Sequence, residues 1–374
     1  MSNPSSRHAE AHPLARPLRN CARAPVDPLH EFQIRPLQIT WEMTQACAPK
    51  ARRKRPRSNA PHDRQLSTAE AFHLIDQAAD MHVPLLVLSG GNPLVRPDLF
   101  PLLEYSCRRS VRTSLTLLAS PELTRDLIFE LKGTGLMRIG LWLEGSTPAL
   151  HDAARGATSP CRRTLEAIGW CNEAGLPVQI NTTIARRNFH DVDPMIELLV
   201  RLDVALWSVF FFVPAVREQA GNLLSAEEHE RVFARLYAAS KRVHFAIKTN
   251  EGQHYQRYLL EQRARESHTR ISESEILARA PKNVDDGKGL IFVNHAGEVY
   301  PSRFLPLSSG NVTRTPLREI YASSPLFLSL RDRSLLKGKC RRCMFRNVCG
   351  GSRARAYACT GDPLAEEPCC AYQP

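Results

Sequence analysis

No apolar stretch in this 374-residue sequence approaches the roughly 18 residues that a membrane-spanning helix requires. The N-terminal segment also lacks the apolar centre of a secretory signal. Neither observation favours insertion into a membrane or export across one. We therefore expect a cytoplasmic protein without a membrane partner.

Acidic residues are in deficit: the chain has 38 Asp and Glu against 50 Lys and Arg, which gives a formal net charge of +12. The excess is spread along the chain except for one dense block at residues 50–57. Such a block suits a phosphate-rich partner, and a solvated loop is the competing interpretation. Because the block has no aromatic residue on which a base could stack, we do not expect nucleic acid to be a partner.

Apolar residues, in contrast, make up 43% of the chain, enough to bury a full core. Residues 1–34 are rich in Pro, Arg and Ala without periodicity, which predicts a poorly ordered leader. After them, strand-like apolar runs alternate with amphipathic helical segments. The six runs are residues 37–43, 84–91, 113–120, 137–146, 177–184 and 205–214. This alternation predicts an α/β fold with a parallel sheet covered by helices, either an open doubly wound sheet or a partial barrel.

Two of the helices have recognisable starts. Ser67 with Glu70, and Ser225 with Glu228, have the spacing of a capping box, in which each side chain satisfies a free amide at the helix N-terminus. In both candidate architectures, ligands bind where parallel strands end. The unusual residues of this sequence lie at those ends: Cys47, "SGGNP" at 89–93, "LEGS" at 143–146 and "NTT" at 181–183.

Beyond residue 245 the pattern changes. A charged, helical segment is followed by "GLIFVNHAGEVYPS", whose apolar alternation around a turn indicates a β-hairpin. We therefore predict four parts: a leader at 1–34, an α/β domain at 35–245, a helical linker at 246–285 and a small Cys-rich domain at 286–374.

Six of the eleven cysteines fall within the last 35 residues. In a reducing compartment, clustered cysteines argue for metal rather than disulfides. Cys340, Cys343 and Cys349 have C-x2-C-x5-C spacing, and Cys370 supplies a fourth thiol from a distant segment, with Cys369 as its substitute. Four thiolates hold either an iron-sulfur cluster or a structural zinc ion, and the spacing alone leaves both open.

The whole pattern resembles the radical S-adenosylmethionine (SAM) enzymes that carry a C-terminal SPASM or twitch domain with an auxiliary cluster. The ending "LLKGKCRRCMFRNVCGGSRARAYACTGDPLAEEPCCAYQP" is similar to that of the subgroup that includes the haem d1 and alternative haem synthesis enzymes. "LEGSTPALHDAARG", "GLPVQINTTI" and "HAGEVYPSRFLPLSSGNV" fit the same subgroup, so that the resemblance covers roughly residues 37–374.

The resemblance implies a partial (β/α)6 barrel and an auxiliary 4Fe-4S cluster on Cys340, Cys343, Cys349 and Cys370. It also implies radical modification of a porphyrin-like or peptide substrate, together with a partner enzyme or an electron donor. Further residues that it assigns to the SAM or substrate cavity are Gly90, Gly91, Asn92, Glu144, Arg155 and Asn181. Of these, Asn92 stands where the family has an acidic residue.

The family also needs C-x3-C-x2-C after its first strand, because three thiolates hold a cluster whose fourth iron binds and cleaves SAM. Here Cys47 is followed at those spacings by Ala51 and Lys54. Neither a methyl group nor an ammonium replaces a thiolate ligand. Cys47 is then the remnant of the core cluster site, and we expect no reductive cleavage of SAM by this chain; SAM binding itself stays open.

Three explanations of this loop stay open at the level of sequence. The first is a pseudoenzyme that kept its fold and auxiliary cluster, and that binds a ligand, a peptide or a partner enzyme, or passes electrons. Alternatively, residues 49–61 are a translation of shifted codons that obscures the motif of an active enzyme. The third explanation is that the basic block has a binding function of its own.

Overall fold

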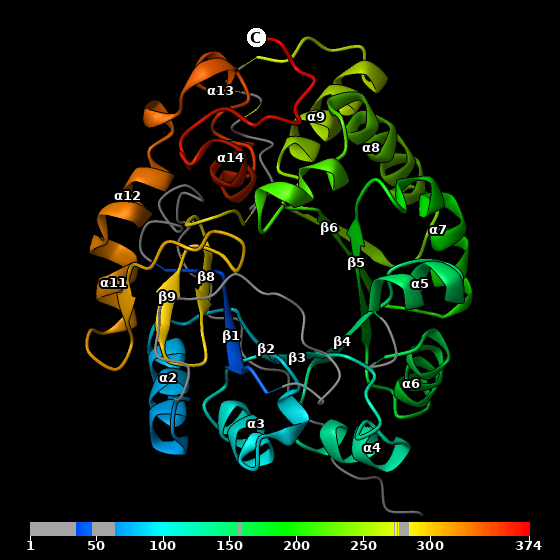
Figure 1. Ribbon diagram of the computed structural model, residues 1–374, viewed down its shortest axis with the longest axis vertical. Helices are drawn as coiled ribbons and strands as arrows, with labels where there is room; N and C mark the ends of the chain where they lie inside the picture. Colours follow the sequence, from blue (N-terminus) through cyan, green and yellow to red (C-terminus); the bar gives the residue numbers. More distant parts are fainter. Residues whose placement is uncertain (1–34, 47–63, 156–158, 273, 275, 277–283) are drawn as a thin grey trace, which may run out of the picture.

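The computed structural model describes residues 35–46, 64–155, 159–272, 274, 276 and 284–374 (Figure 1). The expected leader at 1–34 lies outside the described residues. So does the segment that contains Cys47, Ala51 and Lys54.

A single, mostly parallel sheet organises the described residues, in the order β10-β9-β8-β1-β2-β3-β4-β5-β6-β7. The strands are β1 (Gln38–Thr44), β2 (Leu85–Gly90), β3 (Thr113–Leu117), β4 (Arg138–Trp142), β5 (Val178–Ile184), β6 (Leu206–Phe211), β7 (Ala246–Asn250), β8 (Leu290–Val293), β9 (Glu298–Tyr300) and β10 (Gly310–Asn311). Strands β1 to β7 pair in parallel with their neighbours, and β8 pairs in parallel with β1. The six predicted strands are confirmed as β1 to β6, and the predicted hairpin is the antiparallel pair β8 and β9.

The helices that connect β1 to β7 lie along the outer side of the curved sheet (Figure 1). The described helices are α2 (Thr68–Asp80), α3 (Leu99–Arg108), α4 (Arg125–Gly133), α5 (Pro148–Arg155), α6 (Cys161–Glu173), α7 (Val192–Arg201), α8 (Ala226–Ser240), α9 (His254–Glu266), α11 (Leu317–Ser323), α12 (Pro325–Arg331), α13 (Gly338–Arg342) and α14 (Arg353–Thr360). Both predicted capping boxes are confirmed, at the starts of α2 and α8. Every described helix is too short or too polar to cross a bilayer.

The two faces of the sheet differ in burial. In β1, Ile39 and Trp41 are fully buried and belong to the core between sheet and helices, whereas Gln38 and Thr40 keep some exposed surface. The same alternation recurs at the start of β2 and in β5. Because successive side chains of a strand point to opposite faces, the less buried residues lie on the face that the helices do not cover. We call the interior of the partial barrel, which this face lines, the hollow.

Residues 246–250 fall in the segment that we expected to be a helical linker, and in the structure they form β7. This strand extends the parallel sheet beyond β6, with Lys248 opposite Ser208. Its sequence "AIKTN" lacks apolar alternation because Lys248 and Asn250 face the hollow instead of a packed core. The boundaries of the four predicted parts remain predictions.

Candidate functional site

The Gly90–Gly91 pair holds the end of β2 against the end of β1. The amide of Gly91 donates to the carbonyl of Thr44 and the amide of Asn92 donates to the carbonyl of Ala46, both at 2.7 Å. A Cβ on Gly91 would lie 2.0 Å from the carbonyl oxygen of Ala46, so only glycine allows this approach. The pair thus fixes the backbone that leads into the segment after Ala46.

Asn92 is buried, and its side chain is engaged within the protein. Its Oδ1 accepts from the amide of Leu94 at 3.2 Å, in the short 3-10 helix η1 (Pro93–Val95). Its Nδ2 donates to Ser120 Oγ at 3.4 Å and to Glu122 Oε2 at 3.3 Å. A hydrogen bond from Ser120 keeps the pKa of Glu122 below its usual value. Sequence reasoning missed Glu122, which places a carboxylate beside Asn92 from the end of the neighbouring strand.

Glu144 and Arg155 meet as a buried ion pair beyond the end of β4. The second carboxylate oxygen of Glu144 accepts from the amide of Thr183 at 2.8 Å, and the guanidinium of Arg155 lies 4.5 Å from the ring of Trp142. The structure therefore brings these two predicted residues together. The third, Asn181, lies opposite Trp142 in the sheet and accepts a hydrogen bond from Gln179 at 2.6 Å.

A second acid-base pair, missed in the sequence, lies where β1 approaches the β8–β9 hairpin. Glu42 Oε2 is 3.5 Å from His295 Nδ1, and both side chains are buried. Neither ring nitrogen of His295 has a hydrogen-bond partner among the described residues. The only sequence signal was the "NHAG" turn, which was interpreted as a hairpin turn.

The four cysteines predicted as ligands line one pocket in the C-terminal segment. Cys340 and Cys343 come from α13 and its end, while Cys349 and Cys370 complete the wall. Cys340 Sγ accepts from the amide of Glu367 and Cys349 Sγ from the amide of Gly351, both at 3.3 Å. Hydrogen bonds to a thiolate sulfur stabilise its charge, so this pocket suits metal-bound thiolates.

Two consecutive glycines shape the turn after Cys349. Gly350 and Gly351 both have φ of +69°, a left-handed conformation that favours glycine. A Cβ on Gly350 would lie 2.4 Å from Arg333 Nη1. The turn directs the Gly351 amide back to the sulfur of Cys349.

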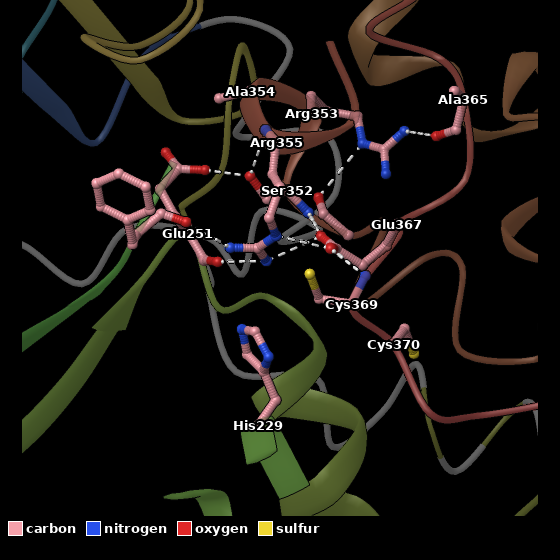
Figure 2. A network of polar contacts seen from close by, with 12 residues as sticks. His229, Glu251, Ser352, Arg353, Ala354, Arg355, Ala365, Glu367, Cys369 and Cys370 are labelled. Atoms are coloured by element: carbon pink, nitrogen blue, oxygen red, sulfur yellow. Dashed lines mark hydrogen bonds and ion pairs between the residues drawn. The ribbon is translucent and has the colours of Figure 1, made fainter. Parts of the chain in front are cut away.

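The adjacent thiols of Cys369 and Cys370 have different surroundings. Cys370 lines the pocket with the other three cysteines, whereas Cys369 is not among the residues that line it. In Figure 2, Cys369 lies beside the Arg355–Glu367 contact, and Cys370 lies farther along the segment. The geometry therefore favours Cys370 over Cys369 as the fourth ligand.

The protonation of the thiols bears on how this pocket would bind a metal. Burial raises the pKa of Cys349 well above its usual value and that of Cys370 to about 11, so binding of the metal is coupled to loss of protons.

A buried ion pair lies beside the pocket, which Glu367 itself lines (Figure 2). Arg355, in α14, donates to both carboxylate oxygens of Glu367, at 2.8 and 3.0 Å. Burial opposes ionisation of Glu367, but the Arg355 guanidinium holds the pKa of that carboxyl well below its usual range. Glu367 also accepts from the amides of Ser352 and Cys369, so that one carboxylate fixes both sides of the cysteine segment.

The same arginine joins the cysteine segment to the barrel. Arg355 Nη2 donates to the carbonyl of Glu251, just after β7, at 2.8 Å, and Arg355 Nη1 donates to the carbonyl of Phe212, just after β6, at 3.4 Å. The hydroxyl of Ser352 donates to the carboxyl of Glu251. The pocket is therefore anchored on the strand ends at which a barrel ligand would bind.

Comparison with known proteins gives a family match for the barrel residues and another for the C-terminal residues. Residues 47–199 match the Radical SAM superfamily, and residues 286–344 match SPASM, an iron-sulfur cluster-binding domain. An "AdoMet-dependent heme synthase" of Methanosarcina barkeri is 35% identical over 340 residues, which cover 91% of this chain and 97% of the relative. A "PqqA peptide cyclase" of Rhizobium meliloti is 28% identical over 324 residues, covering 83% of this chain and 80% of the relative.

A solved structure has the same fold. Streptococcus suis SuiB bound to the precursor peptide SuiA aligns with a TM-score of 0.69 at 16% identity, over 91% of this chain and 78% of that structure. This likeness confirms the α/β fold with a Cys-rich C-terminal region. Together, these matches show that the chain belongs to the radical SAM superfamily, in the SPASM-containing subgroup that includes the AdoMet-dependent heme synthases.

Proposed function

We propose that this protein binds a porphyrin-like molecule in the hollow of its barrel and a 4Fe-4S cluster in its C-terminal pocket. The observation that carries the proposal is the convergence of Cys340, Cys343, Cys349 and Cys370 on one pocket anchored to the strand ends. The heme synthase relative supports a porphyrin-like ligand over a peptide, because its identity and coverage exceed those of the peptide cyclase.

The chain's own residues prepare the cluster site. The amides of Gly351 and Glu367 point at two of the sulfurs, and the Arg355–Glu367 pair holds the backbone of both segments. When bound, such a cluster supplies electron transfer. We further propose that the barrel corresponds to residues 35–245 together with β7, and the auxiliary-cluster domain to 286–374.

We also propose that the chain with this sequence does not begin radical chemistry. Cys47 offers one thiolate, while Ala51 and Lys54 stand at the two other ligand positions. Glycines 90 and 91 and the Glu144–Arg155 pair would then border a ligand site in which SAM is not cleaved. The competing proposal is an active enzyme whose motif is obscured by shifted codons.

Anaerobic reconstitution with iron and sulfide tests these proposals. We expect about four irons for each chain and no deoxyadenosine when SAM and a reductant are added. The double variant Ala51→Cys/Lys54→Cys is the matched gain-of-ligand control, and we expect it to bind about eight irons. About eight irons with deoxyadenosine formation by the unaltered chain would contradict the absence of SAM cleavage.

Two further measurements separate the alternatives. Zinc without sulfide in the purified protein would remove the cluster assignment. Resequencing of the gene would reveal a compensating insertion and deletion around the codons for residues 49–61 if the reading-frame explanation holds; an unbroken frame would eliminate it.

A further inference from the structure

Two cations lie on the inward face of the barrel strands. Arg138 is the first residue of β4, on the same face as Gly140, where an added Cβ would meet the side chains of Thr116 and Asn181. Lys248 lies in β7 on the same face as Asn250, whose Nδ2 donates to Ser208 Oγ at 2.7 Å. Both side chains therefore point into the hollow.

A contact across the hollow places the lysine ammonium. Lys248 Nζ donates to Gln38 Oε1 at 3.2 Å. Gln38 is the first residue of β1, and five strands separate β1 from β7 in the sheet. The ammonium therefore lies inside the barrel, near the end where the parallel strands begin. We call this end the floor of the hollow and the opposite end, where the strands finish, its mouth.

These cations have no carboxylate partner within the part of the chain that the structure describes. Arg138 has no ion pair there, and its Nε is buried without a hydrogen-bond partner. The contact that places Lys248 is with the neutral amide of Gln38. Strands β1 to β8 contain one carboxylate, that of Glu42, which lies toward the mouth beside His295.

Uncompensated cations in a protein interior are costly, because the interior solvates a charge less well than water. Burial, reinforced by the charge of Arg138, lowers the pKa of Lys248 to about 8, so the ammonium still carries its charge at neutral pH. Arg112, an exposed residue, adds a third positive charge next to Arg138. Cations arranged in this way attract an anion into the hollow.

We propose that Arg138 and Lys248 form a carboxylate-binding subsite on the floor of the barrel. A guanidinium fork matches a carboxylate in two hydrogen bonds, and an ammonium adds a compact charge beside it. If the ligand is porphyrin-like, as proposed above, the subsite takes an acidic side chain of the macrocycle. That identity rests on the proposed function, whereas the preference for a carboxylate rests on the two cations alone.

Fluorescence titration of the full chain with coproporphyrin III and with its tetramethyl ester tests the subsite. We expect the acid to bind more tightly than the ester. Lys248→Met and Arg138→Met should each weaken binding of the acid at least roughly tenfold and leave binding of the ester unchanged. Lys132→Met removes the same charge from the exposed surface of α4 and serves as the matched control.

A second measurement separates failure of the subsite from failure of the porphyrin assignment. Acetylation of Lys248 by acetic anhydride, measured by mass spectrometry, should slow when coproporphyrin III or glutarate is present. Protection by glutarate or by an acidic peptide, without porphyrin binding, would keep the carboxylate subsite and overturn the porphyrin-like ligand. Equal affinity of the acid for the unaltered chain and both Met variants, without protection by any carboxylate, would overturn the subsite.

Discussion

The C-terminal segment and the barrel hollow differ in whether their buried charges have partners of opposite charge. In the C-terminal segment, Arg355 is fully buried and shares two hydrogen bonds with Glu367. In the hollow, Lys248 donates to the neutral amide of Gln38, and neither Lys248 nor Arg138 has an ion pair among the described residues. The two regions also differ in their cysteines. Four cysteines line the C-terminal pocket, whereas the sequence has one, Cys47, directly after β1.

This difference distinguishes a site that the chain completes from one that a ligand must complete. The pocket is lined by four thiols, receives two amide donors and lies beside a compensated ion pair. In the hollow, no described carboxylate pairs with Arg138 or Lys248, so an anionic ligand would remove a charge imbalance there. Four predictions test whether the two regions differ as strongly as their contacts indicate.

The largest expected effect is loss of the metal centre. Cys349→Ser should remove most of the iron bound after anaerobic reconstitution, because a hydroxyl is a poor ligand for iron in a sulfur site. Iron, sulfide and visible absorbance measure it. Cys369→Ser is the matched control and should keep its iron, since Cys369 does not line the pocket. The opposite pattern would show that the ligand set is wrong.

Next in size is the cost of breaking the buried ion pair. Glu367→Ala leaves the Arg355 charge buried and should lower the free energy of unfolding by roughly 3 to 5 kcal/mol. Urea unfolding followed by circular dichroism, without oxygen, measures the change. Glu173→Ala breaks the exposed pair with Arg125 and should cost about 1 kcal/mol or less. Equal costs would mean that burial does not set the strength of the C-terminal pair.

The sequence predicts features that lie within a short stretch of the chain better than contacts between distant segments. The capping box of Ser67 and Glu70 is a short pattern, and it was predicted correctly. The C-x2-C-x5-C spacing is also short, and the structure places its three cysteines on one pocket. The Arg355–Glu367 contact could not be predicted, because α14 and the last segment meet only after folding. Strand β7 was missed because Lys248 interrupts the apolar pattern, and its polarity makes sense only once the hollow is known.

Lys248, which has no ion pair among the described residues, should give the stability of the protein a pH dependence. The pKa of Lys248 is about 8 in the folded chain, against an ordinary value of 10.5. Between these pH values the unfolded chain binds a proton that the folded chain has lost, so the free energy of unfolding should rise with pH through this window. The rise should be roughly 2 to 3 kcal/mol.

Urea unfolding at a series of pH values, compared between the unaltered chain and Lys248→Met, isolates this contribution. The variant has no ammonium to neutralise, so the difference in stability between the two proteins should shrink as pH rises from 8 to 10.5. A constant difference would mean that the folded lysine keeps its ordinary pKa and that the hollow already contains a compensating charge.

The smallest expected effect concerns the glycine that holds the mouth of the barrel together. Gly91→Ala places a Cβ 2.0 Å from the carbonyl of Ala46, and the backbone must move to admit it. We expect a loss of about 1 to 2 kcal/mol in the free energy of unfolding. Gly169→Ala, in α6, meets no atom within 4 Å and should gain about 0.5 to 1 kcal/mol instead. A loss in Gly91→Ala and a gain in Gly169→Ala would show that β1 and β2 are closely packed at the mouth. A gain in both would mean that the close approach of Gly91 to Ala46 is relaxed in solution.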